Sequence, residues 1–332
     1  MPSAWGIHDW DGKTAAPSGC GYYRIIQPLA ELGKNGWQTG WRQGNPPPGP
    51  HDVIAGQRLD RHDGLGMWRR LSLASALVYD IDDDLWNIRR SNWNAYQTFQ
   101  APNRDAVAAY ATYAALVTVT TEPLADIMRR HNRNVAVLPN QVPGWLLDHD
   151  RPRRDGRVVI GWAGGASHGE DLAMIARPLR AVLADCPDAE VHIIGCDFRA
   201  TIGADPAQMR YSDWLPIGLD GDYYRMIDFD IALAPLTGTI FDESKSAIKA
   251  LEAMALGIPV IASACTAYRG VVVDGVTGYA AASRSEWKRR LRELVNDGAA
   301  RAEMGAKARE AARGHVIDAG WRLWADAYRA LL

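Results

Sequence analysis

The amino-acid sequence predicts an α/β protein with two domains, each built around a parallel sheet. Short β-like runs alternate with longer helical patterns along the chain, as in consecutive βαβ units. The chain has 332 residues, whereas single hydrophobic cores rarely grow past roughly 250 residues. A stretch at 139–156, rich in proline and charge and without periodicity, divides the alternation into two halves. We therefore predict a first domain at 1–150, a second domain at 151–315 and a C-terminal helix at 316–332.

The hydrophobic pattern predicts the individual elements. In the first half, strands are expected at 53–55, 76–81, 116–120 and 135–138, and helices near 22–33, 104–115 and 122–131. In the second half, strands are expected at 157–162, 191–195, 230–234, 259–263 and 277–281, and helices at 170–184, 244–256, 284–296 and 298–312. The segment 45–50, Asn-Pro-Pro-Pro-Gly-Pro, must be a loop, and the stretch from Asp318 to Leu332 is amphipathic and aromatic.

Composition and charge exclude several classes of protein. The formal net charge is -2, so the chain as a whole lacks the basic footprint of a nucleic-acid-binding protein. Its four scattered cysteines form no Cys-x-x-Cys pair, which predicts neither a disulfide framework nor a zinc site. An apolar run of about 20 residues is missing, and the start lacks the basic and apolar regions of a signal peptide. We therefore expect a cytoplasmic protein without a transmembrane segment.

The first candidate site opens the first long helix. Its sequence, from Ser18 to Arg24, is Ser-Gly-Cys-Gly-Tyr-Tyr-Arg. Glycines at a strand-to-helix turn let a ligand approach the backbone, and the free amides of the helix start favour an anion. Gly19, Gly21 and Arg24 are therefore candidate ligand-binding residues. The third glycine of a full Gly-x-Gly-x-x-Gly motif is missing, so a simple tight turn is an alternative interpretation.

The second candidate site is the acidic run Asp80-Ile81-Asp82-Asp83-Asp84, at the carboxyl end of the strand 76–81. Ligands of open α/β sheets bind outside the carboxyl ends of the strands. Three adjacent carboxylates repel one another, so at least one should have a raised pKa or a cationic partner. Asp82 and Asp83 are the candidate catalytic residues. The alternative is a solvated acidic turn in which Asp84 caps a helix.

The third candidate site lies between strand 157–162 and helix 170–184, where the chain reads Gly-Trp-Ala-Gly-Gly-Ala-Ser-His over residues 161–168. Gly164 and Gly165 would permit close approach of a diphosphate, while Ser167 and His168 would add hydrogen-bond donors. A structural role for the histidine is the alternative interpretation.

The fourth candidate site is the segment from Asp242 to Ser263. A helix start with serine and lysine beside free amides is typical of a phosphate site, which indicates Lys245, Ser246 and Lys249. Lys245 and Lys249 are four residues apart and would share one helix face. Glu252 would lie near that face, where it could accept hydrogen bonds from two ribose hydroxyls. The alternative is an exposed helix with an ion pair.

In this fourth segment the sequence resembles the GT-B glycosyltransferases, specifically the large retaining glycosyltransferase family 4 (glycosyl transferases group 1), in a subgroup with a Lys-Ser helix start. Relatives carry a helix ending in a phrase like Leu-Glu-Ala-Met-Ala-Leu-Gly-Ile-Pro-Val at 251–260, followed by one like Asp-Gly-Val-Thr-Gly-Tyr at 274–279. The resemblance covers most of 157–312 and extends more loosely to residues 19–24, 79–86 and 138–140.

The resemblance implies two Rossmann-like domains whose parallel sheets face each other across a cleft. The first domain would bind the acceptor, and the second would bind a nucleotide-diphosphate sugar such as a UDP- or GDP-sugar. The C-terminal helix would cross back and pack on the first domain through Trp321, Trp324 and Tyr328. No permanently bound cofactor or metal is implied.

The resemblance also implies roles for individual residues. Glu252 would hold the ribose. Relatives have a sugar-contacting glutamate where this chain has Ser244, so Glu243 or Asp242 would substitute for it. Lys245, Ser246 and Lys249 would grip the diphosphate, and Lys249 would stabilise the charge that builds on the leaving group.

In the first domain, Asp82 and Asp83 stand where many relatives place a histidine, and they would orient the acceptor hydroxyl or accept its proton. The anomeric configuration would be retained.

Several alternatives remain open from the sequence. The acceptor is expected to be a saccharide, but a hydroxymethylated base in DNA is possible if a local basic patch forms. The residues of that patch would be Arg69, Arg70, Arg89, Arg90, Arg129, Arg130 and Arg133. A non-catalytic nucleotide-sugar-binding module would keep Glu252 but lose the first-domain site. The oligomeric state is left open.

Overall fold

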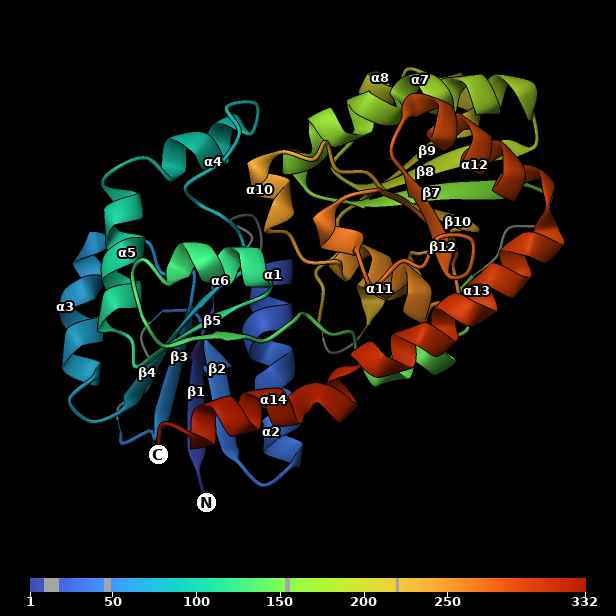
Figure 1. Ribbon diagram of the computed structural model, residues 1–332. Coiled ribbons are helices and arrows are strands. Elements are labelled where there is room, and N and C mark those ends of the chain that lie inside the picture. Colours follow the sequence, from blue (N-terminus) through green and yellow to red (C-terminus); the bar gives the residue numbers. More distant parts are fainter. Residues whose placement is uncertain (9–17, 45–48, 153–155, 219–220) are drawn as a thin grey trace.

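The computed structural model describes residues 1–8, 18–44, 49–152, 156–218 and 221–332. They form two α/β lobes side by side, and the C-terminal helix runs back from the second lobe to the first (Figure 1). Each lobe contains a six-stranded sheet whose paired strands all run parallel, as predicted. Among the described residues, no helix is both long and apolar enough to cross a bilayer.

The first sheet has the strand order β2-β1-β3-β4-β5-β6. Its strands are β1 (Ser3–Ile7), β2 (Gln38–Arg42), β3 (Val53–Gln57), β4 (Ala76–Ile81), β5 (Leu116–Val119) and β6 (Val135–Val137). The helical segments of this half are α1 (Gly19–Gly21), the π-helical η1 (Tyr22–Ile26), α2 (Gln27–Lys34), α3 (His62–Leu71), α4 (Trp93–Thr98), α5 (Asn103–Tyr113), α6 (Glu122–Met128) and the 3-10 turn η2 (Gly144–Asp148). Val53 and Ala55 pack in one apolar cluster and Ile54 in another, so both faces of the sheet are buried.

The four strands predicted for the first half are confirmed, but the sequence pattern misses β1, β2, α3 and α4. Glycines weaken the β signal of the two missed strands. A Cβ on Gly6 of β1 would lie 2.3 Å from Ile25 Cγ2, and one on Gly40 of β2 would lie 2.2 Å from the Trp5 ring. Both positions therefore need glycine for packing, at the expense of β propensity.

The second sheet has the strand order β12-β11-β10-β7-β8-β9. Its strands are β7 (Val158–Gly164), β8 (Ala189–Gly195), β9 (Met209–Asp213), β10 (Ile231–Ala234), β11 (Val260–Ser263) and β12 (Gly278–Ala281). The helices are α7 (Gly169–Asp185), α8 (Arg199–Ile202), α9 (Asp222–Arg225), α10 (Ile240–Glu243), α11 (Ile248–Ala255), α12 (Arg284–Asn296), α13 (Gly298–Ala312) and α14 (Ile317–Arg329). Short 3-10 turns are η3 (Ala166–His168), η4 (Pro206–Gln208), η5 (Thr266–Tyr268) and η6 (Arg313–His315).

The single helix predicted at 244–256 is wrong at its start. Residues 240–243 form the short helix α10, which begins with a capping box between Thr239 and Asp242. Residues 244–247 are not helical, and α11 begins at Ile248. Lys245 therefore lies in the connection and Lys249 in the helix, so the two lysines do not share a helix face. The helix ends at Ala255, one residue before the predicted end at 256, and Gly257 follows with a φ of 68°.

The C-terminal helix α14 packs on the first lobe, which confirms that prediction. Trp324 and Tyr328 are buried in the same apolar cluster as Leu29 and Leu32 of α2, and Trp321 packs against that cluster. The helix therefore ties the end of the chain to the first lobe.

The loop predicted at 45–50 falls partly on residues 45–48, which lie outside the described residues, as do residues 153–155 of the predicted linker.

Candidate active site

The two predicted catalytic carboxylates follow β4 and share one arginine. Arg58 Nη2 lies 2.5 Å from Asp82 Oδ1 and 3.1 Å from Asp83 Oδ2. Gln57 Nε2 donates a further hydrogen bond to Asp82 Oδ1 at 3.3 Å. The cationic partner expected for the acidic run is thus Arg58, at the end of the neighbouring strand β3. Burial raises the pKa of Asp82, but Arg58 and a hydrogen bond from Cys20 outweigh it and hold that pKa below its ordinary value.

Arg58 has an unusual backbone conformation, with a φ of 48°. A residue with a side chain rarely adopts this left-handed conformation, and such strain clusters at functional sites. Here it goes with a guanidinium that bridges two carboxylates. The sequence gives no signal for this arginine, because its role depends on a backbone angle and on the alignment of two strands.

Asp84 has a different role from its two neighbours. Its Oδ1 accepts hydrogen bonds from the backbone nitrogens of Trp86 at 3.0 Å and Asn87 at 3.2 Å, and Oδ2 accepts one from Asn87 Nδ2 at 2.7 Å. The side chain is fully buried. Asp84 therefore caps a turn, close to the alternative interpretation of this run, although no helix follows directly.

The glycine turn opens the first helix as predicted, with Ser18 as its cap. Ser18 Oγ accepts a hydrogen bond from Gly21 N at 3.0 Å. Gly19 is half-buried and faces the second lobe, since a Cβ there would lie 3.5 Å from Ile217 Cδ1. Gly21 is buried. The turn thus lies at the boundary between the lobes.

Arg24 is buried in a polar cluster of the first lobe. Its Nη2 and Nε bind Asp80 at 2.7 and 3.0 Å, and its Nη1 reaches the Leu138 carbonyl and Asn140 Oδ1. Each guanidinium nitrogen is therefore engaged within the fold. Asn140 Nδ2 in turn donates to Ser246 Oγ in the second lobe at 2.9 Å. Arg24 thus supports a contact between the lobes rather than facing open space.

The glycine loop after β7 lies against a lysine. Lys249 Nζ donates to the Ala163 carbonyl at 2.8 Å and lies 5.3 Å from the centre of the Trp162 ring. A Cβ on Gly164 would lie 2.6 Å from Lys249 Nζ and 2.7 Å from Trp162 Cζ2, so a side chain here would displace the ammonium group or the packed ring. Gly165 is exposed and Ser167 is half-buried. Burial, helped by Lys245, holds the pKa of Lys249 below its ordinary value, although Glu252 opposes this.

His168 is buried at the start of α7 and bound to a carboxylate. Its Nδ1 lies 2.8 Å from Asp171 Oδ2. Burial and the charges of Lys249 and Lys245 hold the pKa of His168 well below its ordinary value, so the imidazole is neutral at pH 7. With Asp171 accepting, Nδ1 carries the proton and Nε2 is an acceptor. At neutral pH the ring therefore contributes polarity without charge.

Lys245 joins the two lobes. Its Nζ lies 3.2 Å from Asp83 Oδ1 and 4.5 Å from the centre of the Phe241 ring. Burial alone would lower the pKa of Lys245, but Asp83 raises it above the ordinary value. The carboxyl edge of the first sheet and the lysine segment of the second lobe are thus in direct contact.

The acidic pair before Lys245 divides into two roles. Asp242 is fully buried, and its Oδ2 accepts hydrogen bonds from Thr237 Oγ1, Thr239 N and Thr239 Oγ1, each at 3.0 Å. Glu243 is half-buried, and its carboxylate makes no hydrogen bond or ion pair with another described residue. Asp242 therefore has a structural role, while Glu243 remains the candidate for a sugar contact.

Glu252 is buried and surrounded by tyrosine hydroxyls. Tyr23, from the first lobe, donates a short hydrogen bond to Oε1, and Tyr223 OH lies 3.5 Å from Oε2. Tyr224 OH lies 2.6 Å from Tyr23 OH. Burial raises the pKa of Glu252, although the tyrosine hydrogen bonds and Lys249 oppose it. The sequence gives no hint of this arrangement.

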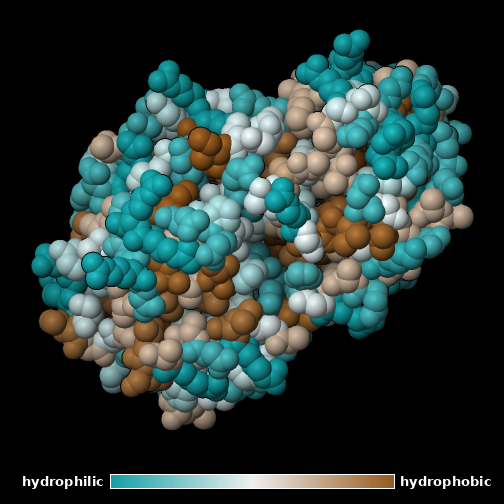
Figure 2. Space-filling view, viewed as in Figure 1, coloured by the Kyte–Doolittle hydropathy of each residue, from teal (hydrophilic) through white to brown (hydrophobic). Residues whose placement is uncertain are grey.

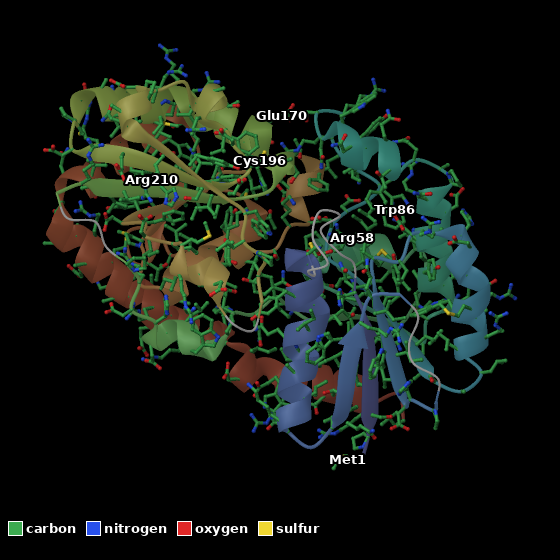
Figure 3. All side chains as sticks on the ribbon, turned by 180° about the vertical axis from the view of Figure 1, so that it is seen from behind. Met1, Arg58, Trp86, Glu170, Cys196 and Arg210 are labelled. Atoms are coloured by element: carbon green, nitrogen blue, oxygen red, sulfur yellow. The ribbon has the colours of Figure 1, made fainter. Side chains whose placement is uncertain are left out.

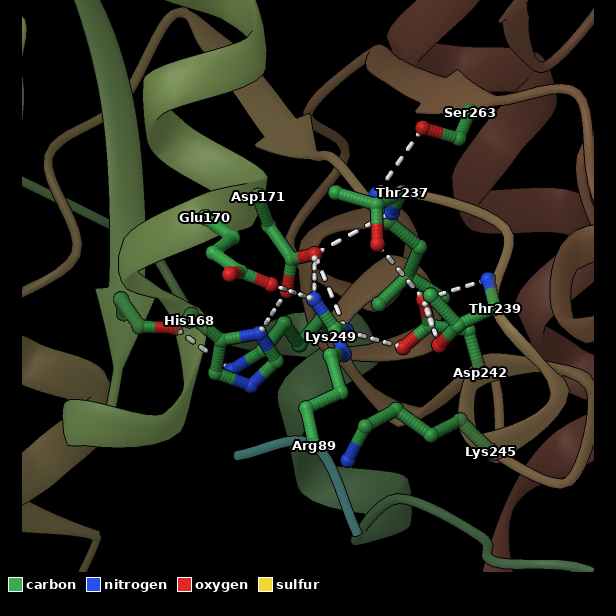
Figure 4. A network of polar contacts seen from close by, with 12 residues as sticks. Arg89, His168, Glu170, Asp171, Thr237, Thr239, Asp242, Lys245, Lys249 and Ser263 are labelled. Carbon is green, nitrogen blue, oxygen red and sulfur yellow. Dashed lines mark hydrogen bonds and ion pairs between the residues drawn. The ribbon is translucent and has the colours of Figure 1, made fainter. Parts of the chain in front are cut away.

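Arg89 reaches from the first lobe into the second (Figure 4). Its guanidinium binds Asp171 Oδ1 at 3.2 Å through both terminal nitrogens, makes a short contact with Asp242 Oδ1, and lies 3.3 Å from Glu170. Thr237 N also donates to Asp171 at 3.1 Å. Asp171 and Asp242 are completely buried, so a residue of the first lobe neutralises two buried carboxylates of the second.

Three of the arginines considered for a DNA acceptor have partners of their own in the structure. Arg89 turns into the second lobe, and Arg129 pairs with Glu122 at 2.6 Å and Asp126 at 2.5 Å. Arg69 lies over the Tyr113 ring on a different helix. The charges of Arg89 and Arg129 are thus neutralised by carboxylates.

Residues 237–311 match the family model described as Glycosyl transferases group 1. Among solved structures, the chain is similar to sucrose-phosphate synthase from Thermosynechococcus elongatus, with 16% identity over 100% of this chain and 99% of that chain, and a TM-score of 0.68. It is also similar to Anabaena HepE in complex with UDP and glucose, with 14% identity over 99% and 100% of the two chains and a TM-score of 0.68. The fold is GT-B.

A third GT-B neighbour is S. aureus TarM in complex with Fondaparinux, alpha-GlcNAc-glycerol and UDP. It has 15% identity over 83% of this chain and 55% of that chain, with a TM-score of 0.61. No curated protein matches the chain. The region matched by the family model contains Lys245, Lys249 and Glu252.

Candidate residues of the two lobes come together where the lobes meet, since Lys245 of the second lobe contacts Asp83 of the first. In the view from behind, Arg58 marks the side of the first lobe and Glu170 the side of the second (Figure 3). The surface is indented between the lobes (Figure 2). Within the described residues, no group of three or more His, Cys, Asp or Glu side chains is arranged to hold a metal ion.

Proposed function

We propose that this protein transfers a sugar from a nucleotide-diphosphate sugar to a hydroxyl of a saccharide acceptor. The observation that carries the proposal is the contact between Asp83 Oδ1 and Lys245 Nζ at 3.2 Å. It joins the carboxyl edge of the first sheet to the region that matches the group 1 glycosyl transferases. A donor held by lysines on one side would therefore meet a hydroxyl held by carboxylates on the other.

The second lobe offers a site for the donor. Lys245 and Lys249 supply two ammonium groups for a diphosphate, and Ser246 adds a hydroxyl beside them. The glycine loop at 164–165 leaves the backbone accessible, with Ser167 and neutral His168 as further hydrogen-bonding groups. Anabaena HepE was solved with UDP and with UDP-glucose, which supports a UDP-sugar ahead of a GDP-sugar.

Glu252 would bind the hydroxyls of the nucleotide's ribose, and Glu243 would contact the donor sugar. Lys249 is the residue that we propose to stabilise the departing diphosphate. As the bond to the sugar breaks, negative charge builds on the bridging oxygen, and a desolvated ammonium group stabilises that charge more than bulk water does.

The first lobe would bind and activate the acceptor. Arg58 keeps Asp82 ionised, so this carboxylate could accept a proton or a hydrogen bond from the acceptor hydroxyl at neutral pH. Asp83 would hold Lys245 toward the donor. By resemblance to family 4, we propose that the anomeric configuration is retained and that residues 1–150 with 316–332 bind the acceptor while 151–315 bind the donor.

A non-catalytic nucleotide-sugar-binding module is the second candidate. The observation that favours it is Ser244, which stands where relatives carry the sugar-contacting glutamate and is buried here. A hydroxymethylated base in DNA is not favoured as the acceptor, because Arg89 and Arg129 of the arginines considered for it are paired with carboxylates of this chain.

The test is a panel of UDP-, GDP-, ADP- and dTDP-sugars, with thermal shift and slow donor hydrolysis as readouts. We expect one donor to stabilise the protein, and Glu252→Ala to abolish this stabilisation. Asp82→Asn should keep donor binding within about twofold and lower hydrolysis and transfer at least about 100-fold.

Glu303→Ala, at an exposed position of α13, is the control and should behave as wild type. Donor binding with unchanged hydrolysis and transfer in Asp82→Asn would contradict the role of this aspartate. Binding without any turnover in the wild type would favour the non-catalytic module.

A further inference from the structure

Glu252, the proposed ribose ligand, is covered by a side chain from the opposite lobe. Tyr23 OH donates to Glu252 Oε1 across 229 positions of sequence, and Tyr223 OH lies near Oε2. Glu252 is 7% exposed. Both carboxylate oxygens thus face phenolic hydroxyls, where the two hydroxyls of a ribose would otherwise donate.

The local helix geometry places Tyr23 in this position. Residues 22–26 form a π-helical turn, closed by the hydrogen bond from Gln27 N to the Tyr22 carbonyl. Such wide turns are rare and frequently occur at functional sites. Tyr22, Tyr23 and Ile26 belong to the apolar cluster that contains Leu251 and Met254 of α11, whereas Ile25 and Leu29 pack within the first lobe.

The position of Tyr23 is therefore coupled to the arrangement of the lobes. Its helix belongs to the first lobe, so the hydroxyl can leave Glu252 by movement of that lobe. The other contacts across the boundary would break in the same movement. They include Tyr23 OH with Tyr224 OH, Arg89 with Glu170, Asp171 and Asp242, Lys245 with Asp83, Thr121 Oγ1 with the Ser244 carbonyl at 2.8 Å, and Asn140 with Ser246.

We infer that Tyr23 competes with the ribose of the donor for Glu252 and so sets the affinity for the nucleotide. In this arrangement of the lobes the hydroxyls of Tyr23 and Tyr223 occupy the positions on the carboxylate that the ribose diol would take, and a donor must displace Tyr23 to bind. The inference rests on the proposed function, because it requires Glu252 to hold the ribose. Tyr23 would thus make the separation of the lobes a step in donor entry.

Isothermal titration of the full chain with UDP and with inorganic pyrophosphate tests this inference. Tyr23→Phe keeps the ring and removes the competing hydroxyl. We expect the Kd for UDP to fall about tenfold, which corresponds to about 1.4 kcal/mol. Pyrophosphate has no ribose, so its Kd should be the same in the variant and the wild type.

Tyr110→Phe is the matched control, because it removes a tyrosine hydroxyl that donates to the Arg61 carbonyl at 2.8 Å within the first lobe. It should leave both dissociation constants unchanged. An unchanged or higher Kd for UDP in Tyr23→Phe would overturn the inference, as would an equal gain for pyrophosphate.

Glu252→Gln separates the inference from the proposed function. If it weakens UDP binding while Tyr23→Phe has no effect, the competition by Tyr23 is wrong and the ribose site stands. If neither the wild type nor Tyr23→Phe binds UDP, GDP or ADP, both the ribose site and the competition fail.

Discussion

The carboxyl edges of the two sheets neutralise their buried acids in opposite ways. In the first lobe, Asp80 is paired with Arg24 of the same lobe, 2.7 Å away, and both side chains are buried. In the second lobe, Asp171 and Asp242 are completely buried and receive their arginine, Arg89, from the first lobe. The buried Asp80 of the first edge is therefore neutralised within its own lobe, while the two buried acids of the second edge depend on the contact between the lobes.

This difference indicates how the protein could control its charge. When Arg89 is in place, the carboxylates Asp171 and Asp242 are neutralised, and the nearby Lys245 and Lys249 remain to attract an anion. When the lobes separate, the two acids lose their partner and oppose an anion at the same site. Once a donor has displaced Tyr23, renewed closure of the lobes would therefore favour its negative charge for an electrostatic reason, in addition to excluding water.

The largest expected effect is on the stability of the first lobe, where Arg24 neutralises the buried Asp80. Arg24→Ala leaves Asp80 as a buried charge without its arginine, and we expect the free energy of unfolding to fall by about 3–5 kcal/mol. Urea unfolding followed by circular dichroism measures this. Arg70→Ala removes an exposed arginine of α3 and should change the same quantity by less than about 0.5 kcal/mol. Equal effects of the two changes would mean that the Arg24 pair contributes nothing special to the first lobe.

The next largest effect is on sugar transfer, when the arginine that binds Asp171 and Asp242 from the other lobe is removed. We expect Arg89→Ala to lower sugar transfer about 100-fold through loss of the closed geometry. Its cost in unfolding free energy should be smaller than that of Arg24→Ala, because separated lobes let water reach Asp171 and Asp242. Transfer kinetics together with small-angle X-ray scattering, which should report a larger radius of gyration, provide the measurement.

Two further variants sharpen the result for Arg89. Arg89→Lys keeps the charge but cannot bind both carboxylates with a planar fork, so transfer should fall by an intermediate amount, about tenfold. Arg90→Ala, at the exposed neighbouring position, should leave transfer and shape unchanged. Wild-type transfer by Arg89→Ala would show that closure does not depend on this arginine.

The sequence predicted the parts of the fold that carry strong local signals. The buried central strand β4 was predicted with its observed ends, because a strand covered on both faces is a continuous apolar run. The strands β2 and β9 at the sheet edges were missed, since Gln-Thr-Gly-Trp-Arg and Met-Arg-Tyr-Ser-Asp are polar and only partly buried. The break at 244–247 was missed because tertiary contacts of Lys245 and Ser246 replace the helix there.

In the candidate site, too, local sequence signals could be predicted and contacts between distant residues could not. Residue types at strand ends pointed to Asp82, Asp83 and the glycine loop, since ligands of parallel sheets bind at those ends. The partners could not be predicted, because Arg89 lies 82 residues from Asp171 and 153 from Asp242 in the chain. Such pairs follow from how the two lobes meet, which no local pattern encodes.

The smallest expected effect concerns His168. Burial and the charges of two lysines hold the pKa of this histidine well below its ordinary value of about 6.5. At a pH between the pKa of His168 in the folded chain and its pKa in the unfolded chain, only the unfolded chain binds the proton. Acidification from pH 7.5 to 5.5 therefore favours unfolding, by at most about 1.4 kcal/mol per pH unit for this group. His168→Gln should remove this part of the slope in urea unfolding, whereas His62→Gln, at an exposed position, should keep it. An unchanged slope in His168→Gln would mean that the edge with the lysines does not keep this imidazole neutral.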